Sequence, residues 1–165
     1  MTFPARMQSL KTLVEIENLF QKQTYMIQSG YSGTPLAKKL GIKEGFKIRL
    51  VNQPTYYLDL FTDFPSNVEI SNDKKATKDL IHYFAQKATD LIKDITSLRK
   101  EIYPSGMLWI SWPKKASKIQ TDVTEDVIRN LALSNGLVDI KVCAVNEIWS
   151  GLKLVVPVKE RNAIR

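Results

Sequence analysis

The pattern of apolar and polar positions is clearest in the middle of the chain. Residues 107–112 (Met-Leu-Trp-Ile-Ser-Trp) form a bulky, largely apolar run that the turn residues Pro104-Ser105-Gly106 precede and Pro113 ends. A short apolar run bounded by turn residues is typical of a strand buried on both faces. A polar loop and a helix start follow at once. Open α/β sheets present their chemistry in this layout, at the carboxyl ends of their strands.

The same criteria predict further elements on both sides of this run. Asp122 and Glu125 have the spacing of a capping box, which marks the start of a helix there. Thr34 fits the cap and Pro35 the first position of a short helix that ends at Gly41. Helices are predicted at 8–28, 35–40, 56–60, 87–102 and 122–133, and strands at 46–51, 67–71, 79–84, 107–112, 138–145 and 152–158.

Alternating strands and helices followed by a hairpin predict one α/β domain. We expect a mixed, mostly parallel, Rossmann-like sheet that carries helices on its faces and closes with an antiparallel hairpin. The connection 146–151 is too short for anything but an antiparallel pair. The order of the strands around 67–71 and 79–84 stays open. The predicted domain covers 30–158, after an N-terminal helical extension (1–29) and before a tail (159–165).

Composition narrows the class of protein. An apolar share of 44% and a charged share of 25% are those of an ordinary globular domain. Charges at Lys11, Glu15 and Glu17 interrupt the N-terminus, and no apolar run approaches the roughly 18 residues of a membrane span, so we expect a cytoplasmic protein without membrane contact. Because the chain has one cysteine, Cys143, and one histidine, His82, we expect neither a disulfide nor a zinc site, and no cofactor.

The net charge of +7 permits a polyanionic partner. Basic residues cluster in the first half of the chain, at Lys38, Lys39, Lys43, Lys47 and Arg49. They lack the interleaved aromatic residues of a platform for single strands, and a positive charge is also a common aid to solubility. Nucleic acid is therefore a possible partner, but not the favoured one.

Polar and aromatic side chains follow three of the predicted strands. If the strands at 46–51, 107–112 and 138–145 are parallel, their carboxyl ends share one edge of the sheet, where open sheets bind ligands. No arrangement of Ser, His and Asp matches a nucleophile elbow or a triad, so no catalytic residue is predicted. The predicted ligand-binding residues are Asn52, Gln53, Trp112, Lys114, Lys115, Ser117, Glu147, Trp149 and Ser150.

Two interpretations remain open for the loop at residues 114–118, here called the lysine loop. Pro113 directs the loop, and we expect at least one of Lys114 and Lys115 to point toward Asn52-Gln53 or Glu147. Alternatively, the lysines neutralise the nearby acids Asp122, Glu125 and Asp126 on the surface.

Four motifs resemble a bacterial family. They are Gly-Tyr-Ser-Gly-Thr-Pro-Leu-Ala-Lys-Lys-Leu-Gly-Ile (30–42), Leu-Trp-Ile-Ser-Trp-Pro-Lys-Lys-Ala-Ser-Lys (108–118), Thr-Asp-Val-Thr-Glu-Asp (121–126) and Gly-Leu-Val-Asp-Ile-Lys-Val-Cys-Ala-Val-Asn-Glu-Ile-Trp-Ser-Gly-Leu-Lys (136–153). The family is catalogued only as a domain of unknown function, numbered three thousand and fifty-two. The resemblance spans about residues 30–158 and implies no activity, cofactor or catalytic residue.

A looser resemblance is to the C-terminal half of Rossmann-like methyltransferases, in which a helix, a Pro-Gly turn, a strand, a helix and a hairpin come in the same order. Such enzymes need a glycine-rich turn after the first strand, whereas this chain has Asn52-Gln53-Pro54-Thr55 there. Asp73 is placed like an acid that binds a ribose.

The sequence therefore favours a non-catalytic α/β module that binds a partner protein or a small anionic ligand. The alternative is a divergent methyltransferase-like enzyme, and the second alternative is a nucleic-acid-binding protein.

Overall fold

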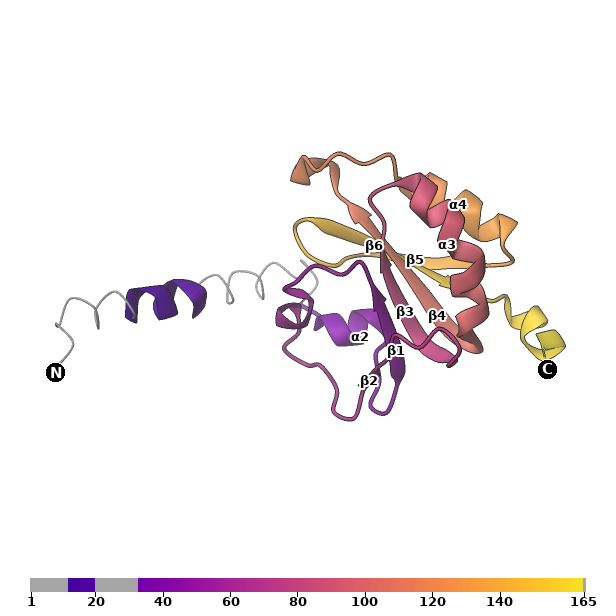
Figure 1. The fold of residues 1–165 in the computed structure, drawn as a ribbon, viewed down its shortest axis with the longest axis horizontal. Helices are drawn as coiled ribbons and strands as arrows, with labels where there is room; N and C mark the ends of the chain where they lie inside the picture. Colours follow the sequence, from indigo (N-terminus) through magenta and orange to yellow (C-terminus); the bar gives the residue numbers. More distant parts are fainter. Residues whose placement is uncertain (1–11, 20–32, 165) are drawn as a thin grey trace.

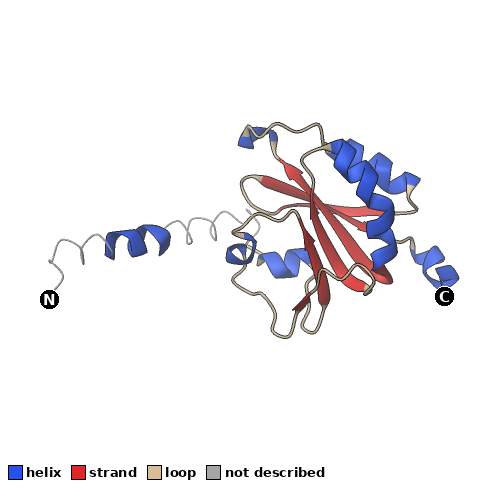
Figure 2. Cartoon of the chain, in the orientation of Figure 1, coloured by secondary structure: helices blue, strands red, loops and turns tan. Residues whose placement is uncertain are grey.

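The computed structural model describes residues 12–19 and 33–164. Residues 12–19 are helical with exposed side chains, and the rest of the helix predicted at 8–28 lies outside the described residues. Within the described residues, no helix has the length and apolar character needed to cross a membrane. The elements of 33–164, drawn in Figures 1 and 2, are α2 (Leu36–Leu40), β1 (Lys47–Val51), η1 (Tyr57–Leu60), β2 (Glu69–Ile70), β3 (Lys78–Phe84), α3 (Ala88–Glu101), β4 (Ile102–Pro113), η2 (Lys115–Ser117), α4 (Glu125–Ser134), β5 (Val138–Ala144), β6 (Trp149–Val155) and η3 (Val158–Ile164).

The six strands form one sheet in the order β2-β1-β3-β4-β6-β5. The pairs β1–β2, β1–β3 and β3–β4 are parallel, whereas β6 is antiparallel to both of its neighbours, β4 and β5. The predicted fold class, a mixed and mostly parallel sheet with a closing antiparallel hairpin, is confirmed. The order left open by the sequence is now defined, because β2 and β3 lie on either side of β1. The carboxyl ends of β1, β3, β4 and β5 share one edge, here called the carboxyl edge.

Helices cover both faces of this sheet (Figure 1). The face under α3 and α4, here called the α3 face, buries apolar side chains such as Ile81, Leu108 and Ile110. The opposite face, here called the α2 face, carries α2 and η1 and buries Leu80 and Trp109. Two hydrophobic cores result, since successive side chains of a strand point to opposite faces.

Strand β4 is longer than the sequence predicted. The stretch Pro104-Ser105-Gly106, predicted as a turn, belongs to the strand, which begins at Ile102. The register between β3 and β4 shifts between Lys78 and Leu80, so the extra residues are absorbed in an irregularity. A Cβ on Gly106 would lie 3.0 Å from the Lys78 carbonyl oxygen. Glycine therefore permits the close backbone approach that the irregularity requires.

Strand β6 begins earlier than predicted, at Trp149, and ends at Val155. The hairpin loop is correspondingly short. The Asn146 side-chain oxygen holds it by accepting hydrogen bonds from the backbone N–H groups of Ile148 (2.9 Å) and Trp149 (2.8 Å). The predicted antiparallel pairing is correct, but two predicted site residues, Trp149 and Ser150, lie within the strand.

The caps of the helices differ from those predicted. Thr124, not Asp122, caps α4 by accepting a hydrogen bond from Val127 N at 3.2 Å. The Asp122 carboxylate instead accepts one from Ala88 N at 2.8 Å, at the start of α3. At α2, Thr34 is not the cap, and Asp63 accepts hydrogen bonds from the first-turn N–H groups. Carboxylates distant in sequence thus accept hydrogen bonds from the free backbone N–H groups at the starts of two helices.

The C-terminal end of α2 follows the prediction. Gly41 adopts a φ of 77°, and its N–H and that of Ile42 close the helix onto Lys38 O and Ala37 O. This left-handed conformation is the one that glycine supplies at helix ends.

Candidate ligand-binding groove

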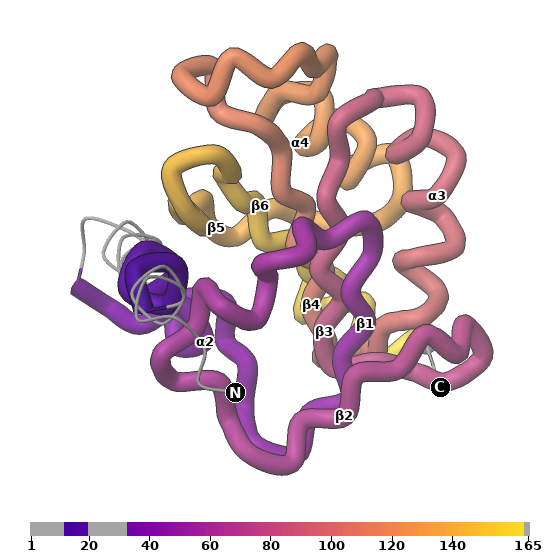
Figure 3. The backbone as a smooth tube through the Cα atoms, turned by 60° about the vertical axis from the view of Figure 1, so that its left-hand side comes forward, coloured from indigo at the N-terminus to yellow at the C-terminus, as the bar shows by residue number. Residues whose placement is uncertain are grey.

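A groove of about 1220 Å³ opens at the carboxyl edge, on the α3 face. It lies between the loop that joins β3 to α3 and the loop that joins β4 to α4. These two loops rise beside each other in Figures 1 and 3. Residues from both loops line it, among them Gln86, Lys87, Trp112, Lys115 and Asp122. The groove therefore joins the ends of two neighbouring parallel strands.

Hydrogen bonds between the two loops fix the walls of the groove. Besides the bond from Ala88 N to Asp122, Thr121 Oγ1 donates to Gln86 O at 2.7 Å and Gln86 Nε2 donates to Gln120 O at 3.4 Å. Through Asp122, the loop between β4 and α4 thereby caps α3, the helix that follows the loop after β3. The groove is preformed, as ligand pockets usually are.

The lysine loop is a compact turn. Ser117 Oγ donates a hydrogen bond to Lys114 O at 2.6 Å and accepts one from Ile119 N at 3.3 Å. Lys118 then reverses the chain in a left-handed conformation with a φ of 59°. The Ser117 hydroxyl, a predicted ligand-binding group, is engaged within the loop and does not line the groove.

Lys114 and Lys115 have different surroundings. Burial lowers the pKa of Lys114, and nearby Glu147 partly opposes this effect. Cys143, which packs on the α2 face, also influences Lys114. Lys114 thus has Glu147 in its surroundings and also borders the groove, and the predicted direction of its side chain stays a prediction.

The other predicted site residues are divided between the two faces. Trp112 packs against the core of the α3 face, and Ser150 is its partner across the β4–β6 pair. Trp149 packs on the α2 face, where its ring is perpendicular to that of Phe84 at 5.0 Å. Asn52 and Gln53 are exposed after β1 and do not line the groove. The nine predicted residues thus share an edge but not a single site.

The acids near the lysine loop are engaged by Arg129. Its guanidinium pairs with Glu125, with Asp126 at 3.2 Å and with Asp139 at 3.2 Å. Asp122 holds the start of α3. Among the described residues no salt bridge joins Lys114 or Lys115 to these carboxylates, and the interpretation that the lysines neutralise them stays a prediction.

Sequence reasoning missed the contribution of β3. Gln86, Lys87 and Thr89 follow this strand and line the groove together with Lys118 and Gln120. The strand at 79–84 was predicted, and its carboxyl end could have been added to the expected edge. Its neighbours in the sheet could not be read from the sequence, because only seven residues connect it to the strand before.

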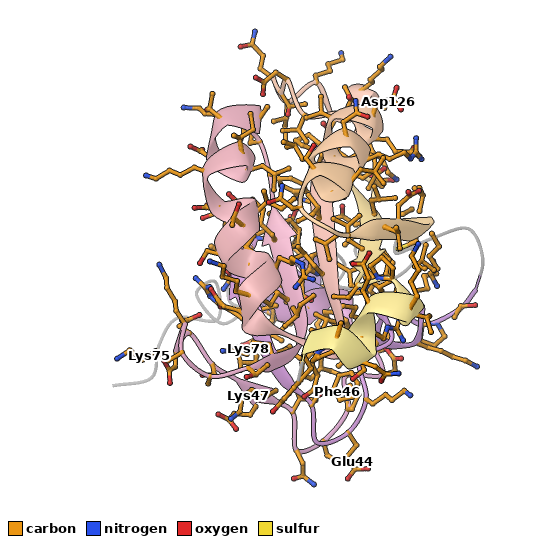
Figure 4. All side chains as sticks on the ribbon, turned by 90° about the vertical axis from the view of Figure 1, so that its right-hand side faces the viewer. Glu44, Phe46, Lys47, Lys75, Lys78 and Asp126 are labelled. Carbon is orange, nitrogen blue, oxygen red and sulfur yellow. The ribbon has the colours of Figure 1, made fainter. Side chains whose placement is uncertain are left out.

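Two positions test the resemblance to methyltransferases. Asn52 has a φ of 56°, so the turn after β1 reaches the left-handed conformation without a glycine. Asp73 lies at the wrong end of the sheet for a ribose ligand, because its carbonyl oxygen accepts a hydrogen bond from Lys78 Nζ at 2.6 Å. Figure 4 shows Lys75 and Lys78 at the opposite end of the molecule from Asp126.

No known protein-family profile matches the chain, and no curated protein matches it. Solved structures do. A ribosomal protein L11 methylase from Lactobacillus delbrueckii subsp. bulgaricus has a TM-score of 0.50 and 13% identity, over 73% of this chain and 74% of that one. A SAM-dependent methyltransferase from Aquifex aeolicus has a TM-score of 0.50 and 16% identity, over 73% and 88%. The magnesium protoporphyrin IX methyltransferase of Synechocystis PCC 6803 has a TM-score of 0.53 and 10% identity, over 73% and 78%.

At these identities the likeness establishes the fold, which is that of the Rossmann-like methyltransferases. The finding contradicts the hypothesis of a non-catalytic module for a partner protein or small anion, and agrees better with the methyltransferase-like alternative. The resemblance to a domain of unknown function stays a prediction.

Proposed function

We propose that the chain is a divergent methyltransferase-like enzyme that binds S-adenosylmethionine in the groove at the carboxyl edge. The observation that carries this proposal is the position of the groove in a sheet with the methyltransferase fold. From β1 the chain passes to β2 on one side and then returns to β3 on the other side, so the switch point lies between β1 and β3. Ligands of open α/β sheets bind at such switch points, and the groove lies beside this one, between the ends of β3 and β4, where Gln86 lines it.

The groups in the groove fit this cofactor chemically. An adenosyl group needs an apolar face for its base and acceptors for its ribose hydroxyls, and Trp112 and the carboxylates of Asp122 and Glu125 supply these. The carboxylate of the methionyl group needs cations, which Lys115 and Lys118 supply. A volume of about 1220 Å³ exceeds the roughly 300–1,000 Å³ of common ligand pockets, so it leaves room for a methyl acceptor.

When bound, the cofactor would supply the activated methyl group. The chain's own contribution is then to orient the two reactants, because a correct approach geometry removes much of the barrier of a bimolecular transfer. The Trp112 ring also favours a positively charged sulfur near its face. We also propose that the protein is cytoplasmic and that it belongs to the bacterial domain-of-unknown-function family that its motifs resemble.

Calorimetric titration of the protein with S-adenosylmethionine and S-adenosylhomocysteine tests the proposal. We expect both to bind, and Trp112→Ala to weaken binding by about tenfold or more, since stacking of a base on an aromatic ring contributes about 1–3 kcal/mol. Trp149→Ala is the matched control, because Trp149 is also partly exposed at the carboxyl edge but packs on the α2 face. Absence of binding, or equal binding by wild type and Trp112→Ala, would contradict the proposal.

A further inference from the structure

The α2 face carries cations that the groove does not use. Lys141 of β5 lies directly opposite Lys153 of β6 in the antiparallel pair. The neighbouring pair on the same face is Cys143 and Gly151, and Cys143 packs against the core of the α2 face. Like charges directly opposite each other destabilise a sheet. Two lysines at this position therefore cost the fold stability rather than adding to it.

This pair belongs to a larger set of cations from distant parts of the chain. Burial lowers the pKa of Lys153, and Lys141, Lys43 and Arg161 lower it further. At the carboxyl edge, Lys39 lowers the pKa of Lys114 in addition to burial. Burial raises the pKa of the Cys143 thiol, and the cations Lys141, Lys39 and Lys114 oppose this, so Cys143 lies between the two groups. The six cations, here called the basic strip, are Lys39, Lys43, Lys114, Lys141, Lys153 and Arg161.

Five members of the basic strip have no carboxylate partner within 4 Å in the described part of the chain. The salt bridges there use Lys47, Arg49 and Arg129 instead. This result changes the grouping that the sequence suggested, because Lys47 pairs with Glu69 and Arg49 with Glu101. The five without a carboxylate within 4 Å among the described residues are Lys43, Lys114, Lys141, Lys153 and Arg161.

Several members of the basic strip lie along β6. It follows β6 from Lys114, beside the start of that strand at the carboxyl edge, to Arg161, whose Nε donates a hydrogen bond to Val156 O at 3.1 Å just beyond the strand's end. A strand of seven residues spans about 23 Å at ~3.3 Å per residue. Such a length matches a row of phosphates rather than a single anionic group.

An aromatic side chain lies at one end of the basic strip. Trp149 is partly exposed on the α2 face and flanks Lys114, whose N–H pairs with the adjacent Ile148 O at 2.7 Å. Its edge-on contact with Phe84 holds the ring in place. Proteins that bind single strands combine a track of cations with aromatic rings on which bases stack.

We propose that the basic strip binds single-stranded nucleic acid, with the phosphates along Lys141 and Lys153 and a base stacked on Trp149. Single-stranded nucleic acid is the ligand we infer, because the cations along β6 complement a row of phosphates and the Trp149 ring at one end can stack with a base. This binding goes beyond the proposed methyl transfer and does not depend on it, because Lys141, Lys153 and Trp149 lie on the α2 face, whereas the groove opens on the α3 face and shares only Lys114 with the strip.

Fluorescence anisotropy with a short labelled oligouridylate tests the proposal. We expect the wild-type chain to bind at low salt and the affinity to fall steeply as salt is added, because binding to phosphates releases counterions. The double substitution Lys141→Gln, Lys153→Gln should weaken binding by about tenfold and reduce the salt slope by about 1.4, since each lost contact with a single strand removes about 0.7. Trp149→Ala should weaken binding without changing the slope.

The matched control is Lys93→Gln, Lys100→Gln, which removes the same charge from exposed positions on α3, on the other face. It should change the affinity by less than about threefold, through the net charge alone. Urea unfolding checks that each variant is folded, and Lys43→Gln, in an exposed loop, tests the strip without altering the sheet. No binding by the wild type at low salt, or equal losses in the two double variants, overturns the proposal. Stronger binding to phosphatidylserine vesicles than to the oligonucleotide also overturns it.

Discussion

His82, the single histidine of the chain, lies in a buried polar chain between two hydroxyl groups. Its Nδ1 is 3.0 Å from the Tyr57 hydroxyl, and its Nε2 is 2.7 Å from Ser111 Oγ. A neutral imidazole has one donor and one acceptor nitrogen, so it satisfies both partners without a charge. The three side chains come from η1, β3 and β4, so the network ties the segment after β1 to the centre of the sheet.

The burial of His82 predicts a loss of stability in mild acid. Burial lowers its pKa to about 3, whereas the unfolded chain binds the same proton near pH 6.5. The unfolded state therefore gains more protons as the pH falls below 6.5, and folding becomes less favourable by about 2 kcal/mol between pH 7 and pH 5. Urea unfolding at the two pH values measures this difference.

His82→Gln gives the control for that measurement. The variant should be less stable at pH 7, because the hydroxyl groups of Tyr57 and Ser111 lose a well-placed partner, but its stability should change little between pH 7 and pH 5. An unchanged pH dependence in the variant would show that another group is responsible.

At the scale of elements, helix starts depend on side chains from other loops. Asp122, just before α4, caps α3, and Asp63, after η1, caps α2. Each of these bonds couples the placement of a helix to a loop that folds elsewhere in the chain. In the case of Asp122, the same bond also closes one wall of the groove.

Asp122→Ala should therefore lower the free energy of unfolding by about 1 kcal/mol, the usual cost of losing a cap. Asp122→Asn, which keeps an acceptor oxygen, should lose less. Asp126→Ala is the control, since Asp126 carries an exposed carboxylate in an exposed ion pair with Arg129 and such pairs contribute about 0–1 kcal/mol. Chemical unfolding of the three variants measures the order, and a loss for Asp126→Ala as large as that for Asp122→Ala would contradict it.

The sequence predicted elements well where local signals determine them. Gly41 ends α2 as expected, and the apolar run 107–112 belongs to β4, with residues 108–111 buried. The predictions were wrong where contacts between residues distant in sequence determine the local structure. Pro104-Ser105-Gly106 became strand because β3 accommodates a register shift, and Asp122 faces α3 rather than its own helix.

The candidate site shows the same limit. The shared carboxyl edge was predictable, since it follows from parallel strands, and Trp112, Lys114 and Lys115 do border the groove. Which face of the sheet each side chain occupies was not, because a register change of one residue moves a side chain to the other face. Trp112 consequently lies on the α3 face and Trp149 on the α2 face.

At the scale of the whole molecule, the hairpin of β5 and β6 completes both cores. Leu152 and Leu154 of β6 are fully buried on the α3 face, and Val145, at the end of β5, is buried on the α2 face. The last strand in sequence thus lies inside the sheet, whereas β5 forms its edge.

Two truncated chains test how far the folded state depends on the interior strand β6. A chain that ends after Pro157 keeps β6 and should stay folded, with only η3 removed. A chain that ends after Val145 loses β6, exposes the edge of β4 and leaves β5 without a neighbour, so we expect it to aggregate or unfold. Circular dichroism and size-exclusion chromatography distinguish these outcomes, and a folded monomer of the shorter chain would contradict the expectation.

The interior place of β6 also bears on how the protein is made. A ribosome delivers β4 and β5 before β6, yet these two strands cannot pair through the native sheet until β6 lies between them. Domains fold as units as synthesis proceeds at about 5–20 residues per second. The nascent chain therefore exposes an open β4 edge until β6 has been synthesised, and during that interval this edge can pair with other nascent chains.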